Sequence, residues 1–451
     1  MSGIAELLVN LGYEVTGSDL SSSPITSRLE SLGVRCAEGH EAGHVRGADL
    51  VVVSTAVPAD NPERTAAGEI GIPVVSRGAM LAELTSLKRT VAVVGSHGKT
   101  TTTAMVAVVL EAAGRDPTAV IGGRLSTFGS NTRLGGGDFM VVEADESDRS
   151  FLCLEPEIAV LTNIDDEHLE AYDGMADLEA SFLGFAQGAA ERGCVVACVD
   201  DPRLRGVVSH VEGRVVTYGI DEPSAHFRAS DIRLEPDRSV FRVMVPGPGG
   251  EDEVIDVSVA SPGRHNVENA LAAVAVGNEL KVRGHTLAQA LANFTGADRR
   301  FQLCGEVDGV VVIDDYAHHP TEIAAVVATA RLRTPGRLRI VFQPHRYSRT
   351  LRLLERFGEV LAAADELIVT DVYAASEAPI PGATKEAVGQ AVARFAAIPV
   401  RLVTTLDDAV DVVVRDARPG DVVVTLGAGS IGTVPSRIIE TLRTRRFGSA
   451  V

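Results

Sequence analysis

The sequence predicts an α/β protein of three domains, and its length, strand pattern and linkers all favour this. The 451 residues are about three times the ~150 of a usual domain. Short β-branched runs alternate with stretches rich in Ala, Leu and Glu almost throughout, which is typical of βα units and parallel sheet. A new strand begins near residue 89, and a small polar linker ends near residue 298. We therefore predict domains at residues 1–88, 89–298 and 299–451.

The first domain is predicted to be Rossmann-like, with strands at residues 13–19, 48–55 and 72–75. The chain opens on what reads as a helix at residues 4–11, whereas a doubly wound domain opens with a strand and a glycine-rich turn. The strand at residues 13–19 is then the second of the domain. We therefore expect that about one strand and its turn lie upstream of Met1.

The second domain is predicted to combine a P-loop ATPase-like α/β core with a β-rich insert. The core begins with a strand at residues 90–94, and the insert has strands at residues 215–218, 227–232, 240–245 and 254–259. The third domain returns to a βα pattern and is again predicted to be Rossmann-like. Its expected strands are residues 310–313, 339–342, 367–369, 400–403 and 422–426.

Composition excludes several classes of function. Lys and Arg number 42 and Asp and Glu 61, a formal net charge of −19, which argues against a duplex nucleic-acid binder because phosphate contacts need clustered cations. Aromatic residues are only 4%, with no Trp, so base-stacking platforms are not expected. Apolar runs are far shorter than the ~20 residues that span a bilayer, and no secretory signal is visible. We expect a cytoplasmic protein that holds anions in a local site.

The strongest motif is a strand, a glycine loop and a helix start at residues 91–102. Glycines let backbone N–H groups surround a phosphate, and a helix N-terminus favours an anion. Lys99 can reach the β- and γ-phosphates and Thr100 can ligate Mg²⁺. The loop has two residues fewer between its glycines than the usual G-x-x-x-x-G-K-[ST], and a generic turn is the weaker alternative. The predicted nucleoside triphosphate site comprises Gly95, Ser96, His97, Gly98, Lys99, Thr100 and Thr101.

Polar side chains follow two further apolar strands of this domain. Residues 139–142 run into a carboxylate cluster that begins with Glu143, and residues 158–161 lead into a polar segment that ends with His168. α/β proteins bind ligands at the carboxyl ends of strands, and Mg²⁺ takes one or two carboxylates while it keeps waters. A solvated acidic turn and a structural histidine are the alternatives for each segment alone. Together, the three strand ends predict one metal and nucleotide site.

Six motifs stand along the chain: GSHGKTT (95–101), EADESD (143–148), GRHNVENA (263–270), RRF (299–301), DDYAHHPTE (314–322) and QPHRYSRT (343–350). In this order they resemble the Mur ligases, and the last two motifs are the specific ones. The resemblance covers essentially the whole chain. In that family the first six residues would directly follow a glycine-rich loop, which agrees with the missing strand.

The resemblance implies ATP-dependent amide formation in peptidoglycan synthesis. The carboxylate of UDP-N-acetylmuramate attacks the γ-phosphate to give an acyl phosphate, which the amine of L-alanine then attacks as phosphate leaves. The site must neutralise charge on the phosphoryl group and on the tetrahedral intermediate. ATP and Mg²⁺ are the implied cofactors. The protein is expected to be a monomer or homodimer, with no nucleic-acid or membrane partner.

Matched positions carry the implied roles. Phosphates are held by Lys99 and Arg300. Mg²⁺ is held by Thr100, Glu143 and His168. The nucleoside of ATP is contacted by Asn266, Asn269 and Asp315. A surface position at a helix start is the alternative for the two asparagines.

The implied catalytic set is completed by a cationic group in the third domain. It consists of His318, Arg346 and Arg349. Arginine supplies the bidentate geometry that an amino-acid carboxylate needs, and a solvated arginine face is the alternative. The UDP end of the substrate is assigned to Asp19, Ser54 and Thr55, for which structural capping is equally favoured.

Three other functions are weighed. A related ligase attaches a whole peptide during wall recycling, although Tyr316 and Glu322 favour the alanine reaction. A NAD-dependent oxidoreductase is suggested by residues 427–432, which fit G-x-G-x-x-G after a strand, but no helix, strand and acid follow. We therefore predict a close-packing turn there. A non-catalytic regulator would bind ATP without acceptor-dependent turnover.

Overall fold

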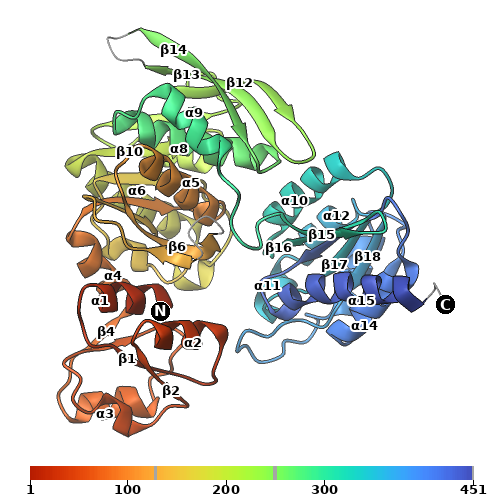
Figure 1. The fold of residues 1–451 in the computed structure, drawn as a ribbon, viewed down its shortest axis with the longest axis horizontal. Coiled ribbons are helices and arrows are strands. Elements are labelled where there is room, and N and C mark those ends of the chain that lie inside the picture. The colour runs from red at the N-terminus through yellow and green to blue at the C-terminus, as the bar shows by residue number, and fades with distance from the viewer. Residues whose placement is uncertain (126–129, 247–250, 449–451) are drawn as a thin grey trace. The chain divides into compact units, whose positions relative to one another are not determined.

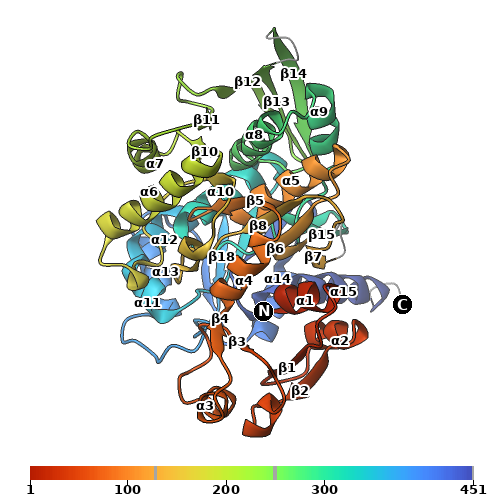
Figure 2. The same cartoon turned by 90° about the vertical axis from the view of Figure 1, so that its left-hand side faces the viewer.

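The computed structural model describes residues 1–125, 130–246 and 251–448 and has an α/β fold (Figure 1, Figure 2). The chain forms two compact units. The first comprises Met1–Ser230, Arg242–Val257 and Glu268–Ala292, and the second comprises Asp231–Phe241, Ser258–Val267 and Asn293–Val451. Among the described residues, no helix combines the length and apolar composition that a membrane span requires.

The N-terminal part of the first unit has its strands in two parallel pairs. The strands are β1 (Thr16–Asp19), β2 (Arg35–Glu38), β3 (Val51–Val53) and β4 (Val74–Ser76). Within the described residues, β1 pairs with β2 and β3 with β4. The helices are α1 (Ser2–Asn10), α2 (Pro24–Ser31), the 3₁₀ helix η1 (Ala42–Val45), α3 (Pro62–Glu69) and α4 (Arg77–Ser86). The predicted strands of this region are all present, though shorter than predicted.

Helices α2 and α3 begin where the sequence supplies both a cap and a proline. The side chains of Ser23 and Asn61 accept backbone N–H bonds from the first turns, and a proline occupies the first helical position of each helix. Such caps satisfy N–H groups that have no partner inside the helix, and proline loses nothing there because its missing N–H would be unbonded. Local sequence therefore determines these helix starts.

The rest of the first unit is built around a ten-stranded sheet in the order β14-β13-β12-β11-β10-β9-β5-β8-β6-β7. Its strands are β5 (Arg89–Val94), β6 (Thr118–Leu125), β7 (Ser130–Arg133), β8 (Phe139–Glu143), β9 (Ile158–Leu161), β10 (Cys194–Cys198), β11 (Val215–Gly219), β12 (Phe227–Leu234), β13 (Ser239–Pro246) and β14 (Asp252–Val259). The four predicted strands of the insert are confirmed as β11 to β14, whose outer members extend into the second unit. Strands β6, β7 and β10 were not predicted.

The helices associated with this sheet follow the βα pattern. They are α5 (Lys99–Ala112), the 3₁₀ helices η2 (Ser150–Cys153) and η3 (Leu169–Ala171), α6 (Met175–Arg192), α7 (Pro202–Val208), α8 (Arg264–Glu279) and α9 (Gly284–Ala292). Helix α5 is buried along nearly its whole length. The helix that carries the lysine of the glycine loop is therefore held rigidly in the core.

The second unit has a six-stranded sheet in the order β15-β16-β20-β17-β18-β19, parallel except for the β15–β16 pair. Its strands are β15 (Gln302–Val307), β16 (Val310–Asp315), β17 (Leu338–Phe342), β18 (Glu366–Val369), β19 (Val400–Leu402) and β20 (Val422–Leu426). Its helices are α10 (Pro320–Arg333), α11 (Tyr347–Arg352), α12 (Leu354–Leu361), α13 (Lys385–Ala393), α14 (Leu406–Asp416), the 3₁₀ helix η4 (Ser430–Thr433) and α15 (Val434–Gly448).

Helices cover both faces of this sheet, as its continuous apolar strands require (Figure 1). Val422 and Val424 of β20 pack into the core that includes α10, α12 and α13. Val423, which points to the opposite face, packs with α14 and α15. Alternate side chains of a strand point to opposite faces, so an unbroken Val run predicts a strand buried on both sides. All five strands predicted for this domain are present.

Candidate functional site

The three polar strand ends lie at one edge of the ten-stranded sheet. Strand β5 is hydrogen-bonded to β8 on one side and β9 on the other, with Val93 opposite Glu143 and Val94 opposite Leu161. All three strands are parallel, so their carboxyl ends and the loops that follow them meet at the same edge. The structure thus brings together the segments that begin at Gly95, Glu143 and Thr162.

The glycine loop depends on two glycines. Gly95 has φ +145 and a Cβ there would lie 2.0 Å from Thr162 Oγ1, while Gly98 has φ +80 and a Cβ there would lie 2.7 Å from Asn269 Oδ1. L-residues rarely adopt either backbone conformation. Helix α5 begins directly after Gly98, so the loop leads into a helix N-terminus, which is where a phosphate would bind.

We predict that Gly95→Ala lowers ATP affinity by about tenfold or more, because the added methyl group must displace the loop after β9, whose contacts shape the phosphate cradle. Equilibrium binding of ATP to the purified variant measures this. Gly184→Ala is the matched control, since a Cβ at Gly184 meets nothing within 4 Å. Unchanged ATP binding by Gly95→Ala would contradict the prediction.

The loop after β9 holds the glycine loop in place. The His97 backbone N–H donates to Asn163 Oδ1 at 2.8 Å, and Thr162 Oγ1 donates to the His97 carbonyl at 2.7 Å. The Asp165 backbone N–H donates to Ser96 Oγ at 2.8 Å. These bonds fix the conformation of Ser96 and His97. The supporting roles of Thr162, Asn163 and Asp165 were not predicted, because nothing in the sequence shows which loop packs on which.

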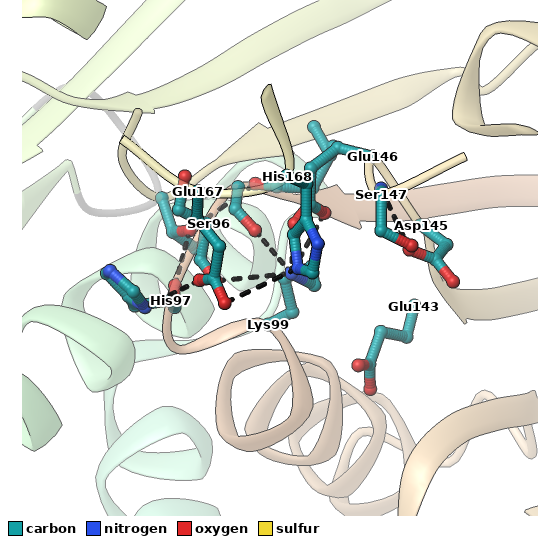
Figure 3. Close-up of polar contacts among 12 residues, drawn as sticks. Ser96, His97, Lys99, Glu143, Asp145, Glu146, Ser147, Glu167 and His168 are labelled. Atoms are coloured by element: carbon teal, nitrogen blue, oxygen red, sulfur yellow. Dashed lines mark hydrogen bonds and ion pairs between the residues drawn. The ribbon is translucent and has the colours of Figure 1, made fainter. Parts of the chain in front are cut away.

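Lys99 occupies the centre of the site (Figure 3). Its ammonium group donates to the Gly95 carbonyl at 2.6 Å and to Glu146 Oε1 at 2.9 Å. Glu146 is only 2% exposed. Burial alone would lower the pKa of Lys99, but the carboxylates of Glu146 and Glu143 hold it above its usual value. Lys99 is therefore a charged cation, as a phosphate ligand must be, and Glu146 is a further site residue that was not predicted.

Glu143 lies beside the first turn of α5. Its Oε1 accepts from Thr100 Oγ1 at 3.1 Å, and its Oε2 accepts from the Gly122 backbone N–H at 2.6 Å. A hydroxyl and a carboxylate this close offer the hard oxygen donors that Mg²⁺ prefers. His168 has φ +57 and its Nε2 lies 3.4 Å from Glu167 Oε1. The donor set of Thr100 and Glu143 fits Mg²⁺, and the metal role of His168 stays a prediction.

The two asparagines lie at the start of α8. Asn269 Oδ1 accepts from Thr102 Oγ1 at 3.0 Å, which ties α8 to α5. Asn266 Nδ2 donates to the Pro262 carbonyl at 2.8 Å. Both side chains therefore support the helix start, and contact with adenine stays a prediction.

In the second unit, the RRF segment is fastened to the end of β16. Asp315 accepts backbone N–H bonds from Phe301 at 2.6 Å and Ala317 at 2.7 Å, and burial raises its pKa to about 6. Arg300 lies over the Tyr316 ring, 5.2 Å from its centroid. Both carboxylate oxygens of Asp315 thus accept backbone N–H bonds. Its contact with the ribose and the phosphate role of Arg300 stay predictions.

The predicted alanine-binding residues lie in a cluster of aromatic and imidazole rings. The His318 ring is 5.4 Å from that of Tyr316 and 5.7 Å from that of His345, and His345 stacks on Tyr373 at 5.5 Å. Arg349, which is 6% exposed, lies with Nη1 3.2 Å from His345 Nδ1.

Arg346 of this cluster precedes α11 with φ +67, and its backbone N–H donates to the Tyr373 carbonyl at 2.9 Å. The structure therefore places His318, Arg346 and Arg349 in one unit, around His345 and Tyr373. The proximity of His345 to His318 depends on the strand order of the sheet, in which β16 and β17 lie on either side of β20.

The residues assigned to UDP follow strands β1 and β3. Asp19 is exposed at the end of β1 and its backbone carbonyl accepts from Gly39 at 2.8 Å. Ser54 Oγ accepts from the Ala56 backbone N–H at 3.1 Å, a contact within the turn that follows β3. Thr55 is exposed. Their role in substrate binding stays a prediction.

The glycines at residues 427–432 are close-packed, as predicted. A Cβ on Gly427 would lie 2.7 Å from the Gln343 carbonyl oxygen, and one on Gly429 would lie 2.6 Å from Tyr373 Cγ. A Cβ on Gly432 would lie 2.6 Å from Arg299 Cζ. Each glycine is needed for packing against a protein neighbour, so this motif gives no support to a dinucleotide site.

Comparison with protein families matches three models along the chain. The description "Mur ligase family, catalytic domain" matches residues 1–89, "Mur ligase middle domain" matches residues 93–277, and "Mur ligase, glutamate ligase domain" matches residues 299–429.

Relatives match over nearly the full chain. UDP-N-acetylmuramate--L-alanine ligase of Burkholderia ambifaria is 50% identical over 99% of this chain and 96% of its own length. The same-named enzyme of Solibacter usitatus is 48% identical over 99% of this chain and 94% of its own length.

Solved structures agree in fold. UDP-N-acetylmuramate-alanine ligase of Thermotoga maritima is similar with a TM-score of 0.83 and 27% identity, covering 99% of this chain and 97% of that one. A murein peptide ligase of Psychrobacter arcticus has a TM-score of 0.73 and 26% identity, covering 98% and 96%. With its glycine loop, its carboxylate segment and its three matched domains, the chain belongs to the Mur ligase family and has the three-domain α/β fold of that family.

Proposed function

We propose that the protein is an ATP-dependent ligase that joins the carboxylate of UDP-N-acetylmuramate to L-alanine in peptidoglycan synthesis. The observation that carries this proposal is the charged Lys99, held at the start of α5 directly after a loop whose conformation requires Gly95 and Gly98. A buried ammonium at a helix N-terminus binds the phosphates of a nucleoside triphosphate. The family and the names of the relatives support the substrates.

Three groups of the first unit would act on the phosphoryl group. Lys99 neutralises charge on the transferred phosphate, and backbone N–H groups at the start of α5 bind its oxygens. Thr100 and Glu143 would hold Mg²⁺, which balances charge on the phosphates when bound. Glu146 keeps Lys99 charged and oriented through its 2.9 Å contact. Their shared task is to stabilise the negative charge that accumulates as the substrate carboxylate attacks.

The cluster of His318, Arg346 and Arg349 would bind the incoming amino acid. An arginine can hold a carboxylate with two parallel hydrogen bonds, and His318 offers an imidazole beside it. Holding the amino acid by its carboxylate leaves the amine to attack the acyl phosphate. This orientation raises the reaction rate, because an amine bound beside the acyl phosphate reacts within one complex and not in a bimolecular collision.

Phosphate release tests the function directly. The full chain is incubated with ATP, Mg²⁺ and UDP-N-acetylmuramate, with L-alanine or a tripeptide as acceptor. We expect release that depends on L-alanine. A preference for tripeptide would identify the related recycling ligase instead, and ATP binding without acceptor-dependent release would identify a regulator. A cytoplasmic location and a monomeric or homodimeric state remain part of this proposal.

A further inference from the structure

Two consecutive carboxylates pair with cations from different parts of the first unit. Glu146 accepts from Lys99 of the glycine loop at 2.9 Å. Asp145 Oδ2 accepts from Arg77 Nη2, also at 2.9 Å. Arg77 is the first residue of α4 and directly follows β4. The acidic pair therefore stands between the phosphate-binding lysine and an arginine from the N-terminal region.

The contact between α4 and the acidic segment is close and fixed. A Cβ on Gly78 would lie 2.4 Å from Ser150 Cβ, so the first turn of α4 rests directly on the segment after β8. Asp145 Oδ1 accepts from Ser147, through the backbone N–H at 3.0 Å and Oγ at 2.6 Å; Figure 3 shows the two side chains together. Asp145 is thus held in one orientation and holds Arg77 in turn.

Arg77 retains donors for a ligand. A guanidinium has five N–H donors, and among the described residues the structure gives this one a single hydrogen bond, to Asp145. Its side chain is 27% exposed. A partly exposed guanidinium with donors to spare can therefore bind an anionic ligand.

We propose that Arg77 binds the carboxylate of the UDP-linked substrate and presents it to the phosphate that Lys99 holds, an inference that rests on the proposed function. Nucleophile and phosphate are both anions, so bringing them into contact needs a cation for each. Arg77 lies at the carboxyl end of β4 and contacts the segment at the carboxyl end of β8. It thus joins the ligand-binding edges of two sheets. Asp145 acts as a positioning residue that orients the guanidinium.

The alternative anion is the diphosphate of the same substrate, and a pair of ligands separates the two. UDP-N-acetylglucosamine carries the diphosphate without the lactyl carboxylate. We expect Arg77→Ala to weaken binding of UDP-N-acetylmuramate by about 10- to 100-fold, the value of a charged hydrogen bond. Binding of UDP-N-acetylglucosamine and of ATP should be unchanged. Arg77→Lys, which keeps the charge but not the bidentate geometry, should recover part of the loss.

Arg89→Ala is the matched control. Arg89 also lies in the first unit and makes two hydrogen bonds to one carboxylate, Glu157, at 2.7 and 2.6 Å, but it begins β5 at the end away from the glycine loop. We expect it to bind all three ligands normally. Thermal unfolding of the full chain checks folding, and titration calorimetry measures affinity. If Arg77→Ala does not fold, Arg77→Lys is used as the test variant in its place.

Each remaining outcome overturns the assignment. Equal weakening of both UDP-sugars would assign Arg77 to the diphosphate. No weakening, or equal weakening of ATP, would leave Arg77 a purely structural link. Wild-type phosphate release is measured alongside: its absence would count against the proposed function, whereas an active wild type with an unaffected Arg77→Ala counts against this inference alone.

Discussion

Lys99→Ala is expected to lower alanine-dependent phosphate release by about 100- to 1,000-fold or more, the cost of losing a charge-stabilising group from a transition state. The ammonium lies between Glu146 and the Gly95 carbonyl, to both of which it donates. Phosphate release in the presence of saturating ATP measures the effect on turnover, and ATP binding measures the effect on affinity.

Two controls accompany this variant. Removing Lys99 takes away the ion-pair partner of the buried Glu146 carboxylate, and this loss can by itself destabilise the fold. The double variant Lys99→Ala/Glu146→Ala removes that carboxylate as well, so it distinguishes a loss of stability from a loss of catalysis. Lys88→Ala is the matched single change, because Lys88 also donates to backbone carbonyls, those of Gly135 and Gly137 at 2.7 Å each, at the opposite end of β5. Retention of more than about a tenth of the activity by Lys99→Ala would be incompatible with its phosphate role.

The second large effect concerns stability. Arg339 is completely buried in the second unit, where Nε donates to Glu366 Oε2 at 2.7 Å and Nη1 to the Val413 carbonyl at 2.8 Å. Asp421 lies 3.9 Å away. Arg337 still pairs with Asp421 at 2.6 Å after Arg339→Met, but buried Glu366 loses its hydrogen-bonded partner and keeps only Arg401, 3.6 Å away. We therefore expect the free energy of unfolding to fall by ~3–5 kcal/mol. Urea unfolding followed by circular dichroism measures it.

The control for this change is a pair on the surface. Arg415 is 62% exposed and bonds to its neighbour Asp416; exposed pairs contribute little, so Arg415→Met should unfold like the wild type. Arg339 lies near the start of β17, whereas the cluster proposed to bind alanine follows its end. Turnover per folded molecule should therefore survive Arg339→Met, and equal stability of the two variants would refute the buried network.

The elements that the sequence predicted well are those whose pattern is local. The unbroken Val run of β20 and the strand, loop and helix around Lys99 are each contained in about 15 residues or fewer, and both are present as predicted. Of the strands that were not predicted, β6 and β7 lack such a pattern, whereas β10 is the short apolar run CVVAC. Strand β6 contains Gly122 and Gly123, and β7 is the polar SNTR; only pairing with neighbours makes them strands.

The residues of the candidate site also fall into those that the sequence identified and those that it did not. The sequence singled out Lys99, Thr100 and Glu143, because a glycine loop and an acidic strand end carry their chemistry in the residues themselves. It did not identify Glu146 as the partner of Lys99 or Asn163 as the support of the loop. A side chain's partner depends on strand order and register, and those follow from the packing of the entire sheet.

By itself, the sequence determined the fold class and the family and predicted the residues of a phosphate site, since these depend on contiguous motifs and on the periodicity of apolar residues. The tertiary structure alone decided which charges meet. Arg77 and Asp145 are 68 residues apart, and Lys99 and Glu146 are 47 residues apart. Folding a parallel sheet places separate strand ends at one edge, so Lys99 meets Glu146 only once β8 lies beside β5. Arg77 meets Asp145 only once α4 packs on the segment after β8.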